Sequence, residues 1–406
     1  MPATLSFSYV RVDSRMSLSI SHWSRLYGDS LGYADLKQEM HDFIVEEQLG
    51  FEPSGEGEHI FLWLEKTNLN TAFVAESLAK FSKLQLRDIT YAGRKDKFAL
   101  TRQWFGVHIA NKKEPNWDEF QLDGAKILKV TRNDRKLRVG VLKGNRFELI
   151  LRNLRPNIEH NIESSAAPFF DALTHRLELI KHQGAPNYYG SQRFGEIRIA
   201  SQEHQPTEPQ PKELEQTGPQ QTGSKQSTST HSLRQGGNLA LAEKLISGEA
   251  IRNRNKRSMA ISALRSWLFN EIIHERIVQD RFHQALLGDA MQLSGSNSFF
   301  LFDDEAEQAK ILQRLAEFDI SITAPLWGDG KLHTVKAAKD LELNCAGRFP
   351  DITQALNALG LKQERRAIRI VPQDFTWQIE DNTLKMQFSL PAGCFATSIV
   401  RELLNV

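Results

Sequence analysis

The segment YAGRKDK at residues 91–97 holds the densest group of side chains that could do chemistry. Its one carboxylate, Asp96, stands among three cationic neighbours, Arg94, Lys95 and Lys97. Nearby positive charge favours the ionised form of a carboxylate, and that is the form a nucleophile needs. An exposed loop of ion pairs would have the same composition, so the residues alone leave both interpretations open.

Basic side chains gather in two other stretches of the chain. Residues 129–155 contain nine lysines and arginines against two acids, a local charge of nine minus two, or +7. The second cluster, IRNRNKR, offers Arg252, Arg254 and Lys256 as expected contacts to phosphates. A groove lined from two sides by separate clusters is typical of an RNA or DNA partner, although a solvated outer face would also carry such charge.

The better-known catalytic motifs do not occur in a credible context. The match of GDSLG to the nucleophile elbow G-x-S-x-G is interpreted as chance, because the preceding SHWSRLY does not resemble a buried strand. No Walker loop, G-x-G-x-x-G fingerprint or H-E-x-x-H motif is found. Cys345 and Cys394 belong to no C-x-x-C pair and to no Cys/His cluster with zinc spacing. The sequence therefore predicts neither a nucleotide cofactor nor a metal.

The composition is that of an ordinary globular protein of two to three domains. The 406 residues are 40% hydrophobic and 25% charged, which is enough apolar mass for more than one core. The net charge, 51 minus 50 or +1, gives no support of its own for a nucleic-acid partner. No apolar stretch approaches the ~18 residues that span a bilayer, and the N-terminus lacks the layout of a signal peptide. We therefore expect a cytoplasmic protein without a membrane partner.

Residues 201–237 differ sharply in composition from the rest of the chain. They contain eight glutamines and four prolines but only two leucines as large apolar side chains. Such a segment cannot bury enough surface to offset the entropy lost on ordering. It is predicted to be a flexible surface insertion without a catalytic role.

The loop around Asp96 is expected between two strands that hold it in place. Strands and helices in this half of the chain follow no regular βαβ alternation, which favours an α+β class. After the insertion, helical periodicity predicts a long buried helix in a largely separate unit, followed by a return to strands and a closing helix. The predicted elements are strands at 43–45, 59–65, 89–91 and 104–109, a helix over 71–86, two strands over 137–151 joined at Lys143–Asn145, a helix over 259–278, strands at 375–379 and 384–390, and a helix over 397–404.

Five segments of the chain form an ordered set: AGRKDKFALTRQWF, GNRFELILR, PNYYGSQRFG, RNRNKRS and LPAGCFATSIVRELLN. In this order they resemble the signature segments of the TruD family of tRNA pseudouridine synthases. The resemblance runs from about residue 40 to the C-terminus, apart from 201–237 and some extra residues near 155–183. Five ordered segments are far more specific than any single motif.

The resemblance implies that Asp96 is the catalytic aspartate and that Phe43, Asn145 and Phe395 contact the substrate. Read alone, each of the last three has a structural role. Phe43 would be a core strand residue, Asn145 a hairpin-turn residue that tolerates positive φ, and Phe395 a staple at a helix entry. The second-tier candidates are Lys95 as a charge partner of Asp96, Phe147 on the same strand face as Asn145, and Tyr188, Tyr189, Gln192 and Arg193 as a lining of the RNA cleft.

The resemblance also implies an architecture. Residues 1–183 and 370–406 together are expected to form an α+β, pseudouridine-synthase-like catalytic domain with a mixed or antiparallel sheet. An α/β TRUD-type domain is expected as an insertion at 184–369, where it would lie as a lid or clamp over the tRNA.

The implied reaction is the isomerisation of uridine to pseudouridine in tRNA, at position 13 by the family's pattern, which needs no redox step, metal or organic cofactor. The uridine would be flipped out of the RNA, stacked on Phe43 and Phe395, and read by Asn145. Ionised Asp96 would attack the ribose, attack the base or assist elimination as a base, and the sequence leaves these three open. The chain is expected to be a monomer that binds tRNA and has no evident protein partner.

Two other functions would use the same basic surface. An RNA-binding or RNA-folding protein without catalysis would gain nothing from a buried carboxylate that faces polyanionic RNA, so Asp96 argues against it. An RNA methyltransferase would need a cofactor-binding loop, and the sequence offers none.

Overall fold

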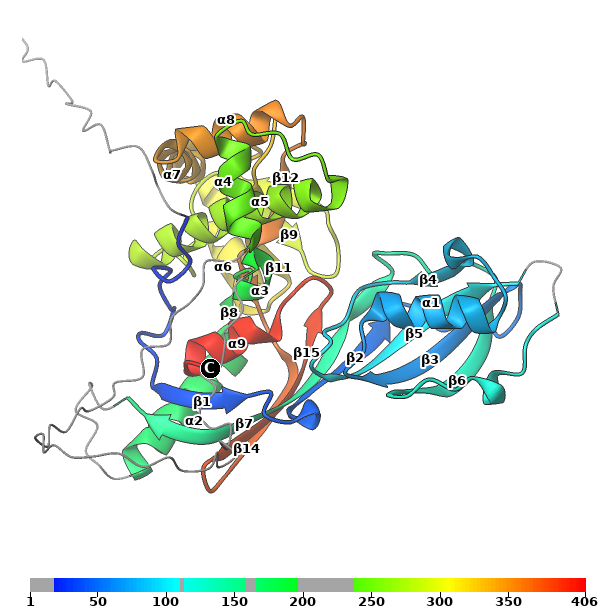
Figure 1. Ribbon diagram of the computed structural model, residues 1–406. Coiled ribbons are helices and arrows are strands. Elements are labelled where there is room, and N and C mark those ends of the chain that lie inside the picture. The colour runs from blue at the N-terminus through cyan, green and yellow to red at the C-terminus, as the bar shows by residue number, and fades with distance from the viewer. Residues whose placement is uncertain (1–17, 110–112, 158–165, 196–236) are drawn as a thin grey trace, which may run out of the picture.

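The computed structural model describes residues 18–109, 113–157, 166–195 and 237–406. The described residues form a long mixed sheet with helices packed against it. A second unit of helices and strands lies above one end of the sheet (Figure 1). Strands β2 (Phe43–Leu49) and β5 (Leu100–His108) run parallel, and the other neighbouring pairs of this sheet run antiparallel. The predicted α+β class with a mixed sheet is confirmed.

The large sheet has the strand order β14-β15-β7-β2-β5-β3-β6, with β1 paired to β7 and β4 paired to β5. Three helices pack on it, and short 3-10 turns at 40–42, 86–88 and 117–119 lead into its strands and loops. The remaining bounds are β1 Gly32–Leu36, β3 His59–Thr67, β4 Ile89–Tyr91, β6 Ala125–Asn133, β7 Leu142–Pro156, β14 Gln373–Glu380, β15 Thr383–Pro391, α1 Thr71–Phe81, α2 Ala166–Gln183 and α9 Ala396–Leu403.

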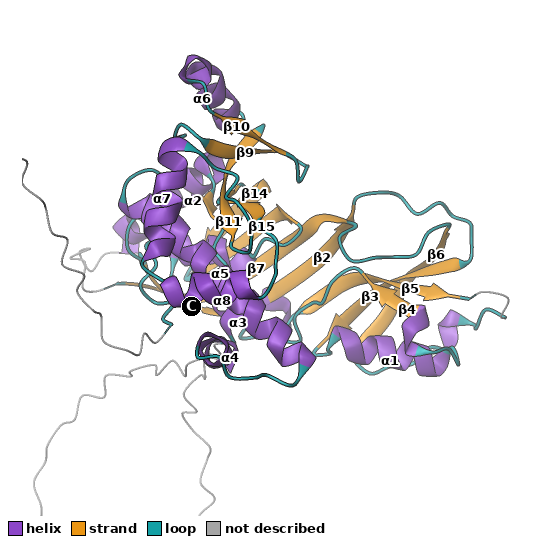
Figure 2. Ribbon diagram, turned by 90° about the horizontal axis from the view of Figure 1, so that it is seen from above, coloured by secondary structure: helices purple, strands orange, loops and turns teal. Residues whose placement is uncertain are grey.

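Strand β3 is apolar along most of its length because both of its faces are covered. Ile60, Leu62 and Leu64 point toward α1 and join its buried side chains in one core. Phe61 points to the other face and packs near Trp104, with 6.1 Å between ring centroids. A strand in the middle of a sheet that is buried on both sides loses the alternation of polar and apolar residues. Figure 2 shows α1 along one side of β3, β4 and β5.

The prediction of two strands joined at Lys143–Asn145 is wrong, because β7 continues through this region as one strand of 15 residues. It pairs with β2 on one side and with β15 on the other. Gly144 lies inside the strand, where a Cβ would come within 2.2 Å of the carbonyl oxygen of Leu390. The glycine is therefore needed for close approach of two backbones and does not mark a turn.

The second unit contains a four-stranded sheet of order β10-β9-β11-β12 and the long helix α5 (Arg254–Val278), which confirms the predicted buried helix. Its core includes the α5 side chains Leu264, Leu268 and Ile272. The other bounds are α3 Ser191–Phe194, α4 Gly237–Ile246, α6 Gln308–Ala316, α7 Lys336–Gly347, α8 Pro350–Ala358, β9 Asp289–Leu293, β10 Phe299–Phe302, β11 Ile320–Leu326 and β12 Glu364–Ala367, with a 3-10 turn at 305–307.

The chain enters and leaves this unit through two short strands that pair with each other, β8 (Ala185–Pro186) and β13 (Arg369–Ile370). We propose this link as the boundary of the inserted domain. The N-terminal segment crosses the boundary, because Leu18 and Trp23 are buried in the core of the second unit although the chain then continues into β1. The predicted insertion at 201–237 lies, except for its last residue, outside the described residues.

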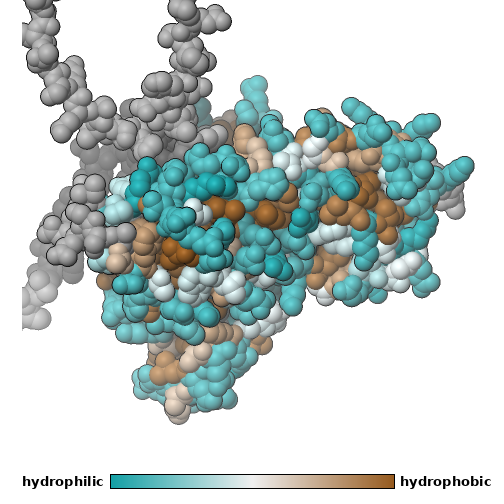
Figure 3. All heavy atoms as spheres, turned by 90° about the horizontal axis from the view of Figure 1, so that it is seen from below, coloured by the Kyte–Doolittle hydropathy of each residue, from teal (hydrophilic) through white to brown (hydrophobic). Residues whose placement is uncertain are grey.

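The outer surface mixes polar and apolar side chains. The face drawn in Figure 3 is mostly hydrophilic, and its apolar side chains form separate patches between charged ones. Among the described residues, no helix combines the length and apolar character that crossing a bilayer requires.

Candidate active site

A cleft of about 1070 Å³ opens between the large sheet and the second unit, and both contribute to its lining. The sheet side supplies the loop from β4 to β5 and part of β7, while the other side supplies α3, the start of α5 and the turn before α9. The lining includes Lys37, Phe43, Arg94, Lys95, Asp96, Lys97, Phe98, Asn145, Phe147, Gln192, Arg193, Met259 and Phe395.

The loop that carries Asp96 is fixed from below by the end of β3. The ammonium of Lys66 donates to the carbonyl oxygen of Asp96 at 2.9 Å and to that of Leu69 at 2.8 Å. Lys66 is fully buried, and burial, the largest cause, together with the charge of Lys95 lowers its pKa to about 8. A buried lysine that donates to backbone carbonyls holds the loop in one conformation.

The carboxylate of Asp96 is bound by one side chain from each half of the cleft. Its Oδ2 lies 2.8 Å from Nζ of Lys37, and its Oδ1 accepts a hydrogen bond from Nε2 of Gln192 at 2.9 Å. Burial alone would raise the pKa of Asp96, but the charge and hydrogen bond of Lys37 and the hydrogen bond of Gln192 outweigh it and lower that pKa below its ordinary value. The carboxylate is therefore ionised at neutral pH.

The predicted charge partner of Asp96, Lys95, is wrong. Its ammonium lies 2.5 Å from Oε1 of Glu47 on β2, and both side chains are almost completely buried. The other carboxylate oxygen of Glu47 accepts a hydrogen bond from the backbone N–H of Trp104 at 3.0 Å. A buried carboxylate needs a compensating cation, so Lys95 turns into the sheet and leaves Asp96 to Lys37. Lys37 follows β1, and no local motif in the sequence pointed to it.

Phe43 and Phe147 form an aromatic wall on the sheet side of the cleft. Their rings meet edge to face at 6.3 Å, and Nζ of Lys37 lies 4.1 Å from the Phe43 centroid. Both side chains are largely buried and both line the cleft. Phe98, which is 60% exposed at the rim of the cleft, is an aromatic candidate that the sequence analysis did not name.

Asn145 lies inside β7, opposite Glu47 of β2 and Leu390 of β15, so its predicted place in a hairpin turn is wrong. Its side chain lines the cleft, and its Oδ1 atom is shielded from water without a hydrogen-bond partner. A buried acceptor left unpaired is costly, and such atoms often mark a place where a ligand supplies the missing donor.

The candidates in the segment NYYGSQRFG separate into two groups. Tyr188 does not line the cleft: it is 2% exposed, donates its hydroxyl to the carbonyl of Ser24 at 3.0 Å and stacks on Trp23. Tyr189 is also buried and does not line it. Gln192 and Arg193 do reach the cleft. Helix α3 begins one residue after the buried tyrosines, and its Gln192 donates to Asp96.

Phe395 and Arg193 meet in the lining of the cleft, where Phe395 packs against the core of the second unit. The ring of Phe395 packs 5.7 Å from that of Tyr189, and the guanidinium of Arg193 lies 5.8 Å from the Phe395 centroid. Phe395 also occupies the N-cap position of α9. The predicted structural role at a helix entry and the predicted place at the substrate site are therefore compatible.

The two basic stretches differ in what they offer to the cleft. Arg252, Arg254 and Lys256 are exposed at the start of α5, one turn from Met259, which lines the cleft. The stretch 129–155 is not a continuous basic surface, because five of its arginines form ion pairs with acidic side chains. These are Arg132, Arg135, Arg146, Arg152 and Arg155.

A cleft with an ionised carboxylate, aromatic walls and basic side chains at its rim defines an enzyme-like site for an anionic, ring-bearing ligand such as a nucleic acid. A family model described as tRNA pseudouridine synthase D (TruD) matches residues 29–204 and 243–403 of the chain. Since these residues make up most of its length, the chain belongs to the TruD family of tRNA pseudouridine synthases. The resemblance carried by the five ordered segments is confirmed.

Named relatives match over nearly the whole chain. The tRNA pseudouridine synthase D of Pseudoalteromonas atlantica is 46% identical over 389 residues, which are 96% of this chain and 97% of that protein. The protein of the same name from Aeromonas hydrophila is 40% identical over 380 residues, which are 94% and 93% of the two chains. The crystal structure of a Methanosarcina mazei protein assigned to the same family superposes with a TM-score of 0.62 at 18% identity, covering 93% of this chain and 94% of that one. That likeness shows a shared fold.

Proposed function

We propose that this protein isomerises uridine to pseudouridine in tRNA and that Asp96 is the residue that acts on the nucleotide. The observation that carries the proposal is the Asp96 carboxylate, held ionised by Lys37 and Gln192 in the cleft between the two units. The names of the relatives support the substrate class. By family resemblance the target is uridine 13.

The reaction breaks the bond from N1 of uracil to C1′ of ribose and forms a bond from C5 to C1′. C5 loses a proton and N1 gains one, so that substrate and product are isomers and no electrons are exchanged. An ionised Asp96 can serve as the nucleophile at C1′, as the nucleophile at the base, or as the base that assists elimination. All three roles require the ionised carboxylate, and the lowered pKa of Asp96 favours that form.

The lining of the cleft suits a uracil turned out of the RNA. Phe43 and Phe147 offer an apolar wall for one face of the ring, and Phe395 adds a third aromatic ring to the lining. The unpaired Oδ1 of Asn145 can accept the N3–H of uracil, while the amide nitrogen can donate to a uracil carbonyl. These contacts would offset the few kcal/mol that unstacking of a base costs.

The exposed cations around the cleft would bind the RNA backbone. Arg94 and Lys97 flank Asp96 and remain exposed, and the cluster at 252–257 lies at the start of α5. Phosphate contacts of this kind position an RNA without reading its sequence. A protein that only binds or folds RNA would not benefit from an anionic Asp96 in this position, which favours the catalytic proposal.

Asp96→Asn tests this proposal directly. The amide keeps the shape of the side chain but can act neither as nucleophile nor as base. We expect tRNA affinity and Tm close to those of the wild type and no pseudouridine in single-turnover assays that follow tritium release from C5-labelled uridine. Asp118→Asn changes an exposed acid in the 3-10 turn at 117–119 and is the matched control, for which we expect full activity. Turnover by the Asp96 variant at even a hundredth of the wild-type rate would refute the assignment.

A further inference from the structure

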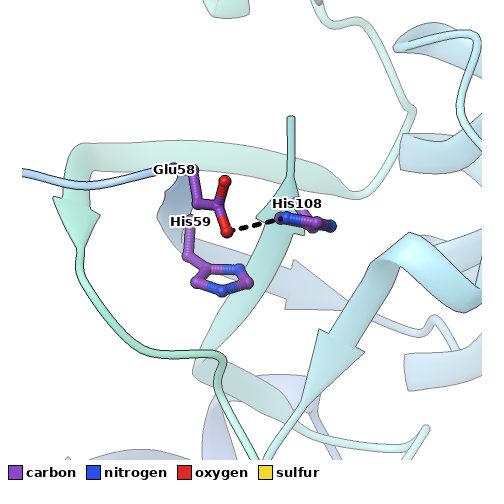
Figure 4. A group of neighbouring side chains, drawn as sticks. All are labelled: Glu58, His59 and His108. Atoms are coloured by element: carbon purple, nitrogen blue, oxygen red, sulfur yellow. Dashed lines mark ion pairs between the residues drawn. The ribbon is translucent and has the colours of Figure 1, made fainter. Parts of the chain in front are cut away.

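Two histidines and a glutamate meet at the end of the sheet that lies away from Asp96. His59 and His108 are directly opposite each other on the antiparallel strands β3 and β5, and their ring centroids are 4.7 Å apart. Glu58 precedes β3, and its carboxylate lies 3.2 Å from Nε2 of His108. One ligand atom from each of the three residues lies within 4.8 Å of the others, and Figure 4 shows the carboxylate directed toward the His108 ring above His59.

The backbone under these side chains is rigid. β3 lies between β5 and β6, so that His59 is paired on both sides. The N–H of Ile109 donates to the carbonyl of Glu58 at 3.2 Å and ties the two strand ends together. Gly57 has a positive φ, and a Cβ there would collide with the backbone of Asn133, which fixes the turn that presents Glu58. The three ligands are thus preorganised by the sheet.

One ring nitrogen of His108 lacks a hydrogen-bond partner. Its Nε2 is shielded from water and makes no hydrogen bond, because the contact with Glu58 is close but poorly aligned. A ring nitrogen in this position, flanked by a second imidazole and a carboxylate, resembles the ligand set of a metal ion more than a hydrogen-bonded pair.

We propose that Glu58, His59 and His108 bind a zinc-type divalent transition metal. Zinc binds well to a set of two imidazoles and one carboxylate. The hard ions magnesium and calcium prefer oxygen ligands, so they should bind this set more weakly. Bond lengths of about 2.0–2.2 Å place tetrahedral ligands about 3.3 Å apart. The Glu58 and His108 ligand atoms are already 3.2 Å apart, and the other separations, which are within 4.8 Å, need to shorten by at most about 1.5 Å. Side-chain rotation can accommodate this movement, because Glu58 is exposed and both histidines are only partly buried.

The metal would hold strands together and take no part in the reaction. His59 and Lys66 stand at opposite ends of β3, and seven steps of about 3.3 Å separate the metal ligands from the residue that anchors Asp96 by about 23 Å. The sequence predicted no metal, because His59 and His108 are far apart along the chain and match no spacing motif. Only the pairing of β3 with β5 brings them together.

The test is a zinc titration of the untagged full-length chain against a chromophoric chelator, with cobalt absorption as a report of the ligand geometry. We expect one site in the wild type, weakened at least about tenfold in His59→Gln and His108→Gln and also weakened in Glu58→Gln, whose exposed position excludes a folding defect. Zinc should raise the Tm of the wild type by a few degrees and leave the rate on tRNA unchanged.

The matched control is His182→Gln, which removes a histidine 3.3 Å from a single glutamate, Glu178, on an exposed helix surface. This variant should bind zinc as the wild type does. Equal affinity of the wild type and the Glu58, His59 and His108 variants would overturn the proposal, as would the absence of zinc binding by the wild type at micromolar concentrations.

Discussion

At the scale of residues, the function of the site depends on which cation faces which carboxylate. Lys37 forms an ion pair with Asp96, whereas Lys95 forms one with the buried Glu47. Replacing Lys37 is therefore expected to change the pH dependence of the rate, and replacing Lys95 is expected to lower the free energy of unfolding. Lys37 helps to lower the pKa of Asp96, and Lys95 compensates the charge of a buried carboxylate in the sheet.

In Lys37→Met, burial is left as the main influence on Asp96 and raises its pKa. Asp96 must be ionised to act, so the rate falls as the pH drops through this pKa, and the acid limb of the pH–rate profile should move to higher pH. At neutral pH the loss of a charge-assisted hydrogen bond should lower the rate about 10-fold to 100-fold. Because the wild-type pKa of Asp96 lies below its ordinary value of 3.8, the profiles must extend from pH 3 to 9 to measure both effects.

Lys95→Met is the comparison for that experiment. It leaves Glu47 buried without a cation, which should cost about 3–5 kcal/mol of unfolding free energy in urea denaturation. The pH–rate profile of the remaining folded protein should keep the acid limb of the wild type. An acid limb that moves in Lys95→Met and stays in place in Lys37→Met would reverse the assignment of the two lysines.

At the scale of elements, the end of β3 anchors the loop that carries Asp96. Lys66→Met removes the donor to the Asp96 carbonyl, and a displacement of about 1 Å at a reacting group can cost about 100-fold in rate. We expect kcat to fall by about that factor with the Kd for tRNA nearly unchanged. Because the pKa of Lys66 is lowered to about 8, the wild-type rate should decline above that pH, and the variant should lack this decline.

Lys126→Met on the edge strand β6 replaces an exposed lysine and serves as the control for Lys66→Met. Its rate and Tm should match those of the wild type. If Lys66→Met retained the wild-type kcat, the loop would hold its conformation without this anchor and the positioning role would be withdrawn.

The described residues on either side of the segment between α3 and α4 lie close together. A Cβ at Gly195 would lie 3.2 Å from the backbone nitrogen of Gly237, and Asn238 donates to the carbonyl of Arg193. Deletion of residues 203–235 therefore leaves a loop short enough to close, and the cost of closure changes slowly with length. Activity and Tm should be nearly unchanged; loss of tRNA binding would show that the segment is a functional arm.

At the scale of the whole molecule, the proposed function requires both units to contact one tRNA. Replacing Arg252, Arg254 and Lys256 together by alanine should flatten the slope of log affinity against log salt by up to about two units. Asn145→Ala should keep that slope and lower the rate on the correct uridine, because it removes a base contact. Filter-binding titrations at several salt concentrations compare the variants, and an unchanged slope in the triple variant would remove the second unit from the binding surface.

The sequence alone was enough to predict the features that depend on neighbouring residues. Helix α1 begins at Thr71 as predicted, and the helix predicted over 259–278 forms most of α5. The Asp96 loop lies between β4 and β5, where the flanking apolar runs placed it. Ordered segment similarity identified the family. Local preferences and contiguous patterns act over a few residues, so a linear reading recovers them.

Tertiary structure decided everything that depends on contacts between distant segments. Asp96 receives Lys37 from a segment 59 residues earlier and Gln192 from one 96 residues later. β7 continues through Gly144 because strands on both of its sides supply hydrogen bonds, although the same residues resemble a turn. Lys95 was assigned to the nearest carboxylate in sequence, but the cost of a buried, unpaired Glu47 directs it elsewhere. Desolvation and strand pairing are properties of the folded chain, and they determine which of its charged residues meet.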